Sequence, residues 1–355
     1  MNPSFWQDKS VLITGHTGFK GSWLSLWLQG LGANVVGYAL SPPTNPNLFD
    51  AAAVAEHMTS IIGDVRDVDH IQSVVQQHQP EIVIHMAAQS LVLPSYTNPV
   101  ETYAINVMGT VNLLEALRHS ESVKAAVTVT SDKCYENYER LWGYRECDPM
   151  GGRDPYSSSK GCAELVTRAF RGSYFSETGL GENHLALASA RAGNVIGGGD
   201  WAPHRLVPDI IESFARGTSV KIRNPHAIRP WQHVLEPLTG YLQLAERLWK
   251  DGMTYAEGWN FGPSDDDAKP VSWVVDELAR LWGDGARWET ASDVHAPESN
   301  YLKLDSSKAK AKLDWKPKLS LPQALEWTVQ WYKTYYRDQP LIREVTREQI
   351  SYFQG

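Results

Sequence analysis

The sequence has few cysteines, and none of the three (Cys134, Cys147 and Cys162) is spaced as a C-x-x-C pair. This excludes a cysteine-ligated zinc framework and a disulfide scaffold, and it fits a reducing compartment. No apolar run approaches the ~20 residues of a membrane-spanning helix, and residues 1–10 lack the apolar centre of a signal peptide. We therefore expect a cytoplasmic protein without a membrane segment.

Basic residues are in the minority, since 33 Lys and Arg stand against 41 Asp and Glu for a formal net charge of −8. An acidic chain argues against a role in coating nucleic acid, although a local basic pocket for phosphate remains compatible with it. No metal site is expected, because the acidic run Asp265–Asp267 is typical of a solvated loop. The 42% of hydrophobic residues exclude a disordered chain, and 355 residues suffice for about two domains.

Apolar strands alternate with amphipathic helices over the first half of the chain, which predicts an α/β fold. A parallel sheet covered by helices on both faces, of the doubly wound Rossmann type, accounts for this order. The expected strands are Val11–Thr14, Asn34–Leu40, Met58–Val65, Ile82–Met86, Ala125–Thr130 and His184–Ala192. The expected helices cover residues 24–31, Asp69–Gln77, Val100–Arg118 and Pro155–Phe170.

The pattern changes after Asn194, where a glycine loop and proline-punctuated segments follow. We expect residues 1–193 to form a dinucleotide-binding domain, to which part of 230–262 also returns. Residues 194–355 then form a smaller, mostly helical substrate-binding region. Its predicted helices are Leu206–Arg216, Pro237–Lys250, Ser272–Leu281 and Leu321–Tyr336.

A glycine-rich turn joins the first strand to the first helix. Its sequence, Gly-His-Thr-Gly-Phe-Lys-Gly from Gly15 to Gly21, has the spacing G-x-x-G-x-x-G. Glycines at such a turn let the backbone approach a pyrophosphate, and the helix N-terminus supplies N–H donors. An ordinary βα turn is the alternative, but the position at the start of an α/β chain favours a dinucleotide. The expected coenzyme contacts in this turn are Gly15, Thr17, Gly18, Phe19 and Gly21.

The choice between NAD and NADP is left open by the segment after the second strand. Tyr38–Pro43 offers neither the acidic residue that binds an adenosine ribose nor an arginine for a 2′-phosphate. Asp64 and Val65, at the end of the third strand, are candidates to seat the adenine. Alternatively, Asp64 caps the following helix.

Tyr156 and Lys160 form the second strong signal. Asp154 and Pro155 start a helix on which Tyr156 and Lys160 are i, i+4 neighbours on one face. A phenol has a reference pKa near 10, and a nearby ammonium favours its ionised form, which makes a base for a sugar hydroxyl. Alone, such a pair is more often a surface contact, but with the glycine turn upstream we assign it to catalysis.

These features together resemble the extended short-chain dehydrogenase/reductase family over nearly the whole length of the chain. Besides the glycine turn and the Tyr/Lys pair, the likeness is carried by Asp64, His85–Gln89, Asn106, Arg191–Val195 and Leu304–Pro317. The resemblance implies that Tyr156 is the base and that Lys160 holds the nicotinamide ribose. It also implies coenzyme contacts from Asp64, Val65, Ala87, Ala88, Gln89 and Asn106, and a homodimer or homotetramer built on helices 100–118 and 155–170.

The end of the fifth strand points to a branch of that family. Thr130–Tyr135 resembles the segment in which sugar-nucleotide 4,6-dehydratases carry Thr-Asp-Glu. The resemblance implies that the hydroxyl of Ser131 hydrogen-bonds the reacting oxygen and that Asp132 protonates the leaving hydroxyl. It also implies that Lys133 removes a proton from carbon. Lysine in place of glutamate, with the segment Pro42–Phe49, is similar to the branch that uses CDP-glucose for deoxysugars of surface polysaccharide. Alternatively, Asp132 caps a loop and Lys133 is a surface charge, or Lys133 stabilises an enolate instead of acting as the base.

On the substrate side, the family resemblance assigns Asn194, Arg205 and Arg229 to the diphosphate and ribose. The planar guanidinium of arginine suits phosphate, although a lone arginine is often only in a surface ion pair. The function expected is that of an NAD-dependent lyase. The rivals are another nucleotide-sugar 4,6-dehydratase, a 4-epimerase, and a non-catalytic dinucleotide sensor on the same fold.

Overall fold

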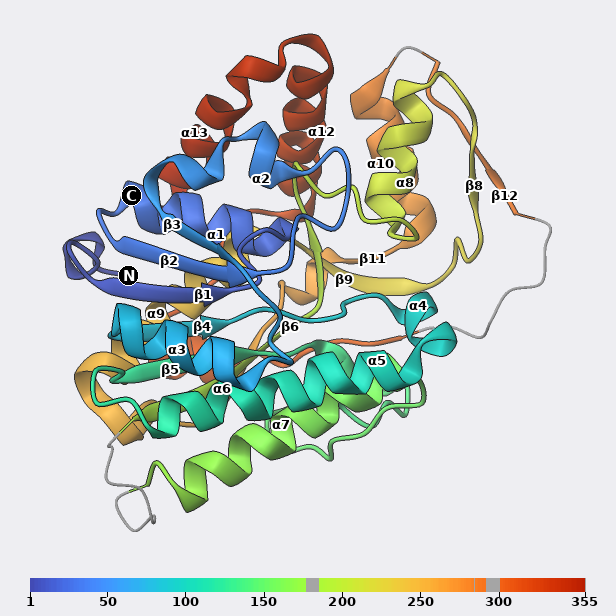
Figure 1. Cartoon of the computed structure of the whole chain (residues 1–355). Helices are drawn as coiled ribbons and strands as arrows, with labels where there is room; N and C mark the ends of the chain where they lie inside the picture. The colour runs from blue at the N-terminus through green and yellow to red at the C-terminus, as the bar shows by residue number, and fades with distance from the viewer. Residues whose placement is uncertain (177–184, 284, 292–300, 355) are drawn as a thin grey trace.

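The computed structural model describes residues 1–176, 185–283, 285–291 and 301–354. Its centre is a seven-stranded, all-parallel sheet in the order β10-β6-β5-β4-β1-β2-β3 (Figure 1). The strands are β1 Ser10–Thr14, β2 Asn34–Ala39, β3 Thr59–Ile62, β4 Ile82–His85, β5 Ala125–Val129, β6 Ala186–Ala192 and β10 Gly258–Phe261. The predicted doubly wound α/β fold is confirmed. Strand β10 was not predicted, and His184, the predicted start of the sixth strand, lies outside the described residues.

The strands are apolar on both faces because each face carries its own core. Val11 and Ile13 of β1 belong to one cluster of buried side chains, and Leu12 between them belongs to the other. Figure 1 shows the helices in two layers that sandwich the sheet. The first layer contains α1 Phe19–Gly30 and α9 Leu235–Asp251, and the second contains α3 Val68–His78, α6 Gly109–Arg118 and α7 Pro155–Ser173. Outside the first layer, α13 Ile342–Gln354 packs against α1 and α9, and α12 Leu321–Arg337 packs against α13.

The helix predicted over 100–118 is continuous but not uniform. It consists of α5 Pro99–Tyr103, a π-helical turn at Ala104–Met108, and α6. The wider turn carries Asn106, which is buried beside α7. Such π turns in helices are frequent at functional sites.

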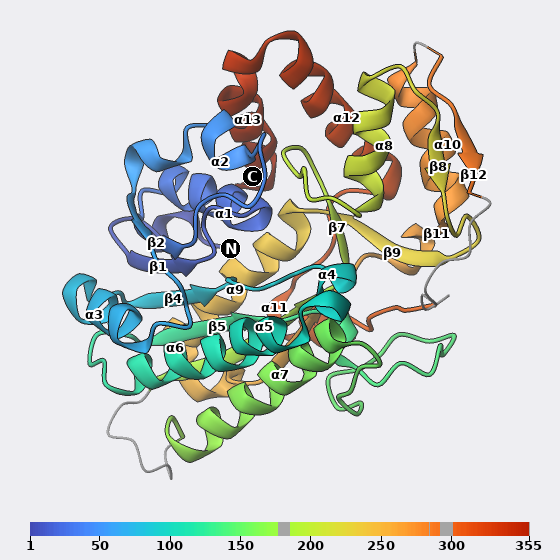
Figure 2. The same ribbon diagram turned by 45° about the vertical axis from the view of Figure 1, so that its right-hand side comes forward.

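The second half of the chain adds helices and two small sheets on one side of the main sheet (Figure 2). The remaining helices include α8 Leu206–Ala215, α10 Val271–Trp282 and α11 Ser307–Leu313, and the short α2 Leu48–Ala51 and α4 Val92–Thr97 lie in the first half. The small sheets are β11-β9-β7 and β12-β8, from β7 Asn194–Ile196, β8 Val220–Ile222, β9 Ile228–His233, β11 Ala268–Pro270 and β12 Trp288–Thr290. Neither sheet was predicted, since their short strands contain prolines and charges.

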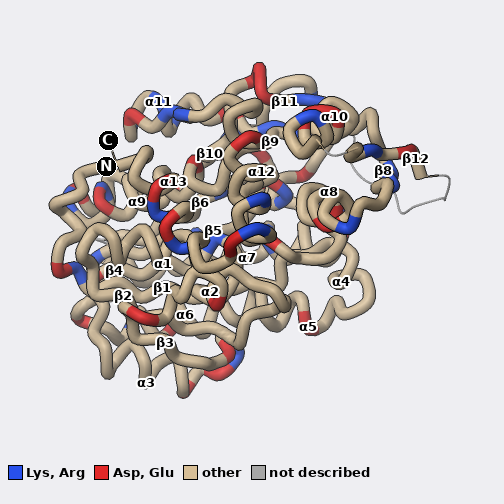
Figure 3. Tube along the Cα trace, turned by 90° about the horizontal axis from the view of Figure 1, so that it is seen from above, with Lys and Arg blue, Asp and Glu red and all other residues tan. Residues whose placement is uncertain are grey.

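The charged residues do not separate by sign. Along the trace in Figure 3, segments of Lys and Arg are interspersed with segments of Asp and Glu. Among the helices that the structure describes, none is long and apolar enough to span a membrane.

A buried carboxylate anchors the segment that leads into α12. Glu236, on α9, accepts hydrogen bonds from the backbone N–H groups of Lys318 (2.9 Å) and Leu319 (2.7 Å). Burial raises the pKa of Glu236 to about 7, although the two N–H groups and the Lys318 charge act in the opposite direction. Between about pH 4.5 and about pH 7, the Glu236 carboxyl is therefore protonated in the folded protein but ionised in the unfolded chain.

This raised pKa predicts a pH-dependent effect of Glu236→Gln. The unfolded carboxyl ionises near 4.5 and the folded one near 7, so ionisation of Glu236 opposes folding increasingly between these values. We expect the unfolding free energy of the variant, relative to the parent, to rise by up to about 3 kcal/mol between about pH 5 and about pH 8. Urea unfolding curves at intervals across this range measure it.

Glu277→Gln on α10 is the matched control. The pKa of Glu277 is lowered, chiefly by its hydrogen bonds with Arg280, so this carboxylate favours folding once ionised. Because Glu277 is ionised in both the folded and the unfolded protein above about pH 5, the difference curve of the control should be flat across this range. A flat difference curve for Glu236→Gln would contradict the assignment of a buried, protonated carboxyl.

Candidate active site

A large cleft runs along the carboxyl edge of the main sheet. Its volume is about 1840 Å³, and its wall includes residues that directly follow strands, among them Gly15, Met86, Thr130 and Gly193. Ligands of open α/β sheets bind at this edge. Because pockets for drug-sized ligands measure roughly 300–1,000 Å³, a cleft of this volume has room for a dinucleotide together with a second nucleotide.

The floor of the cleft is the turn between β1 and α1. Gly15 has a φ of +81°, and a Cβ there would lie 2.8 Å from the backbone nitrogen of Ala87. A Cβ at Gly21 would overlap the carbonyl of Gly15. Gly18 is the N-cap of α1 and makes no side-chain cap, so no side chain covers the first N–H groups of the helix. This cradle fits a pyrophosphate, and the predicted residues Gly15, Thr17, Gly18, Phe19 and Gly21 all line the cleft.

The other side chains of the turn are engaged with the protein. Thr17 donates its hydroxyl hydrogen to the carbonyl of Leu40 (2.8 Å). His16 is buried, with Nε2 2.7 Å from Ser60 Oγ, and burial lowers the pKa of its imidazole to about 4. His16 is therefore a neutral structural residue of the turn.

Asp64 and Val65 line the cleft beyond β3, where the adenine was predicted to lie. The Asp64 carboxylate pairs with Arg66 at 2.6 Å, and this hydrogen-bonded pair lowers the pKa of Asp64. The alternative role of Asp64 as the cap of the next helix is wrong, because the Asp67 side chain accepts the capping hydrogen bond from the N–H of His70.

Ala87, Ala88 and Gln89 also line the cleft, but Asn106 does not. The Asn106 amide donates to the carbonyl of Gln89 (3.0 Å) and to Ser159 Oγ (2.8 Å), and its oxygen accepts from the N–H of Gln89. The predicted contact of Asn106 with a coenzyme stays a prediction, and its described contacts are with protein groups. Asn106 lies behind the wall and holds the segment of Gln89 against α7.

Tyr156 and Lys160 lie on the first turns of α7, which begins as predicted with Asp154 as N-cap and Pro155 at the first position. Both are buried and both line the cleft. Burial raises the pKa of Tyr156, while the charge of Lys133 and a hydrogen bond with Ser131 act to lower it. Burial also lowers the pKa of Lys160 to about 8, against the opposing charge of Glu164. The sequence predicted that the ammonium of Lys160 would lower the pKa of Tyr156. In the structure, the charge of Lys133 has the largest lowering effect on this pKa.

Ser131, Asp132 and Lys133 follow β5 as one tight turn. The Ser131 hydroxyl donates to Asp132 Oδ1 (3.0 Å) and accepts from the N–H of Lys133 (3.2 Å). Lys133 Nζ lies 3.6 Å from Asp132 Oδ1. Asp132 Oδ2 is buried without a hydrogen-bond partner, and a Cβ on Gly193 would approach it to 3.1 Å. The cleft therefore brings an acid, a hydroxyl and an amine together with the phenol of Tyr156.

Lys20 is a cleft residue that the sequence analysis did not predict, although it belongs to the glycine turn. It lines the cleft, and its Nζ lies 3.3 Å from the Tyr241 hydroxyl. Burial, together with the charges of Arg205 and Lys160, lowers the pKa of Lys20 to about 7. A lysine in a turn otherwise built of small and apolar residues was the signal that could have identified it.

The second region supplies the opposite wall. Asn194, Arg205 and Arg229 line the cleft as predicted. Arg205 pairs with Asp200 at 2.9 Å and donates to Ser90 Oγ at 2.9 Å, so its guanidinium is held in place. Two further basic residues of this wall, Lys221 and Arg223, were missed because they lie on or beside the unpredicted strand β8.

Comparison with known proteins agrees with this geometry. The chain is 53% identical over 352 residues to a CDP-glucose 4,6-dehydratase of Salmonella typhimurium, covering 99% of this chain and 98% of that protein. It is 26% identical to a dTDP-glucose 4,6-dehydratase of Xanthomonas campestris, covering 91% and 93%. A dTDP-glucose 4,6-dehydratase structure from Streptomyces venezuelae, with NAD bound, shares the fold at a TM-score of 0.79, with 21% identity over 94% of this chain and 99% of that chain.

A family model described as GDP-mannose 4,6 dehydratase matches residues 12–328, which is most of the chain. The chain therefore belongs to the family that this model describes, within the NAD-dependent epimerases and dehydratases.

Proposed function

We propose that this protein converts CDP-glucose to CDP-4-keto-6-deoxyglucose as an NAD-dependent 4,6-dehydratase in deoxysugar biosynthesis. The observation that carries the proposal is the buried Asp132 carboxylate beside Ser131 and Lys133, in the cleft that also contains Tyr156. Removal of water from carbons 5 and 6 needs an acid and a base beyond the Tyr/Lys pair. The 53% identical relative supports cytidine as the nucleotide.

The residues of the cleft divide the reaction between them. The glycine turn from Gly15 to Gly21 would hold NAD, which would supply the hydride acceptor for C4 and the hydride donor for C6. Tyr156 removes the proton of the C4 hydroxyl, and Ser131 holds that oxygen by a hydrogen bond. The resulting 4-ketone acidifies the C5 proton, whose removal we assign to Lys133, while Asp132 protonates the departing C6 hydroxyl. When the hydride returns to C6, the protonated Lys133 gives the proton back to C5. Asn194, Arg205 and Arg229 are assigned to the diphosphate and ribose.

NAD is favoured over NADP by the charges at the adenosine end of the cleft. Arg66 is the basic residue beside Asp64, and it is already paired with Asp64 at 2.6 Å and with Glu101 at 3.5 Å. The segment Tyr38–Pro43 after β2, where the ribose is expected, also contains no Lys or Arg for a 2′-phosphate. We also assign the reaction to the cytoplasm, consistent with three free cysteines.

A panel of nucleotide hexoses tests the function. Purified protein with NAD should convert CDP-glucose to a 4-keto-6-deoxy product in preference to the UDP, dTDP and GDP sugars, as followed by mass spectrometry. Because the coenzyme is reduced and reoxidised within one turnover, absorbance at the NADH band should show no net accumulation. NADH formed in proportion to product would instead indicate a sugar dehydrogenase, and a 4-epimer product would indicate an epimerase.

Asp132→Asn is expected to separate oxidation from elimination. The amide keeps the shape of the side chain but does not readily deliver a proton, and hydroxide is a poor leaving group. We expect enzyme-bound NADH and a 4-keto-glucose that retains its C6 oxygen to accumulate, and turnover to fall by about 10²–10⁴-fold. Rapid-quench mass spectrometry combined with coenzyme absorbance measures both.

Tyr156→Phe is the matched control, because it removes the proposed base of the first step. It should lose turnover by a similar factor but accumulate no NADH. If Asp132→Asn makes product at the parent rate, Asp132 is a structural residue of the turn and the acid lies elsewhere.

We also propose a homodimer through the outer face of α5, the π turn and α7. This face exposes Val100 (83%), Met108 (51%) and Leu165 (55%), which are apolar side chains on adjacent helices. Leu165→Glu should convert dimers to monomers in sedimentation velocity, because a charge in a closed apolar interface has no partner. Leu341→Glu, at an exposed leucine elsewhere, is the control and should leave the dimer intact. A parent protein that sediments as a monomer would refute the proposal.

A further inference from the structure

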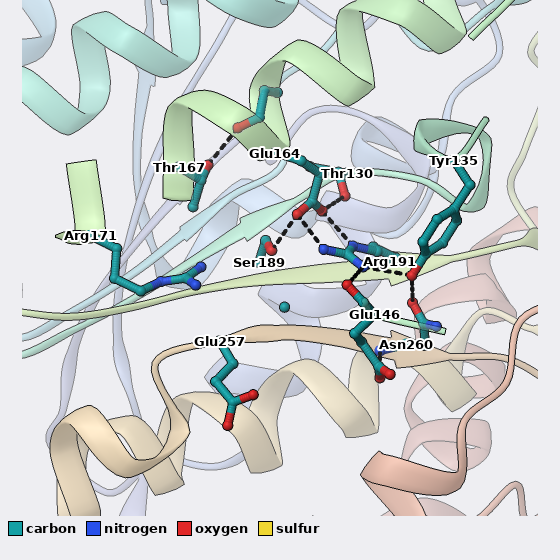
Figure 4. A network of polar contacts seen from close by, with 12 residues as sticks. Thr130, Tyr135, Glu146, Glu164, Thr167, Arg171, Ser189, Arg191, Glu257 and Asn260 are labelled. Carbon is teal, nitrogen blue, oxygen red and sulfur yellow. Dashed lines mark hydrogen bonds and ion pairs between the residues drawn. The ribbon is translucent and has the colours of Figure 1, made fainter. Parts of the chain in front are cut away.

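A buried ion pair lies directly behind the cleft (Figure 4). Glu164 of α7 and Arg191 of β6 are joined by two hydrogen bonds, from Arg191 Nη2 to Glu164 Oε2 (2.7 Å) and from Nε to Oε1 (2.9 Å). Both side chains are almost completely inaccessible. A buried pair of this kind is weak evidence of stabilisation, because the desolvation of two charges offsets their attraction.

The carboxylate of Glu164 accepts two further hydrogen bonds. Thr130 donates to Oε1, and Ser189 donates to Oε2 at 2.7 Å. The two hydroxyls come from different strands, since Thr130 directly follows β5 and Ser189 lies within β6. Glu164 therefore joins the helix of Tyr156 to both strands.

Arg191 extends the network in the other direction. Its Nη1 donates to the hydroxyl of Tyr135, and its guanidinium lies over the Tyr135 ring at 5.1 Å. The Tyr135 hydroxyl donates to Asn260 Oδ1 (2.7 Å) on β10, and the Asn260 amide donates to the carbonyl of Tyr144 (2.8 Å). The position of Tyr135 is thereby fixed from two sides.

Thr130 and Tyr135 bracket the turn that carries Ser131, Asp132 and Lys133. The same ion pair binds the residue before this turn, through Glu164, and the residue after it, through Arg191. Glu164 also lies one helical turn beyond Lys160 on α7. The pair thus connects the two groups of proposed catalytic residues from behind, in addition to the hydrogen bond between Ser131 and Tyr156.

We propose that Glu164 and Arg191 are positioning residues that hold the Ser131–Lys133 turn at a fixed distance from Tyr156 and Lys160. This inference rests on the proposed function, since it assigns the elimination step to that turn. If the Asp132 carboxylate were displaced by a small distance from its position in the cleft, kcat would fall while the affinity for substrate stayed the same. A purely structural pair would instead affect stability alone.

The pair also contributes charge to the site. The groups facing Lys160 are Glu164 and Cys134, together with Lys20 of α1 and His85 of β4, whose pKa values Lys160 lowers. Of the groups that act on the pKa of Lys160, Glu164 has the largest raising effect. Loss of the Glu164 charge should therefore move the deprotonation of Lys160 to lower pH.

Two single variants separate positioning from stability. Thr130→Val and Ser189→Ala each remove one hydroxyl from the same carboxylate, but only Thr130 adjoins the proposed catalytic turn. We expect similar losses of thermal stability. We expect kcat to fall about tenfold in Thr130→Val with KM unchanged, and to stay within about twofold of the parent in Ser189→Ala. Bound NADH should rise at steady state in Thr130→Val only, because elimination is the step slowed.

The double variant Glu164→Gln/Arg191→Gln tests the charge without leaving a buried ion unpaired. The alkaline limb of its kcat profile should move to lower pH by about one unit, whereas Thr130→Val should leave that limb in place. Tyr135→Phe, which removes the other connection, should reproduce the kcat loss of Thr130→Val.

The kcat values of Thr130→Val and Ser189→Ala are measured with the nucleotide sugar that the panel identifies as the substrate. If the proposed substrate is wrong, the result of the panel changes but the ratio of these two kcat values does not. Equal kcat values for Thr130→Val and Ser189→Ala would overturn the proposal. So would an alkaline limb of the double variant that coincides with that of the parent.

Discussion

The backbone of the first βα turn lies so close to the end of β4 that a side chain between them has no room. Gly15 satisfies this constraint through its left-handed conformation and its contact with Ala87. The close approach brings the N-terminus of α1 over the carboxyl edge of the sheet, where it faces the turn after β5 across the cleft. The close approach at Gly15 therefore determines how the coenzyme cradle lies relative to the proposed catalytic turn.

Much of the fold could be predicted because its signals are local. The apolar runs gave six of the seven strands of the main sheet, and Asp154 with Pro155 marked the start of α7. Strand β10 was not predicted because its four residues, Gly-Trp-Asn-Phe, do not form an apolar run. Helix α13 escaped because its buried side chains, such as Ile342, Ile350 and Phe353, are separated by polar residues.

The sequence predicted many of the residues that line the cleft, but it did not predict the electrostatic interactions between them. Sequence spacing placed Tyr156 and Lys160 on one helix, but it did not show that Lys133 and Ser131 act on the phenol. The direction of a side chain was also not predictable, because it depends on packing between segments. Asn106 was expected in the cleft but lies behind its wall, whereas Lys20 was not expected there but lines it.

The sheet is completed late in the chain. Strand β10 pairs with β6, yet the whole of β7 to α9 lies between them in sequence. During synthesis on the ribosome, the hydrogen-bonding edge of β6 stays open until residue 261 has emerged, and Asn260 reaches Tyr135 only then. Nascent chains shorter than this carry an unpaired parallel strand at the domain edge, which makes them templates for intermolecular strand pairing and clients for chaperones.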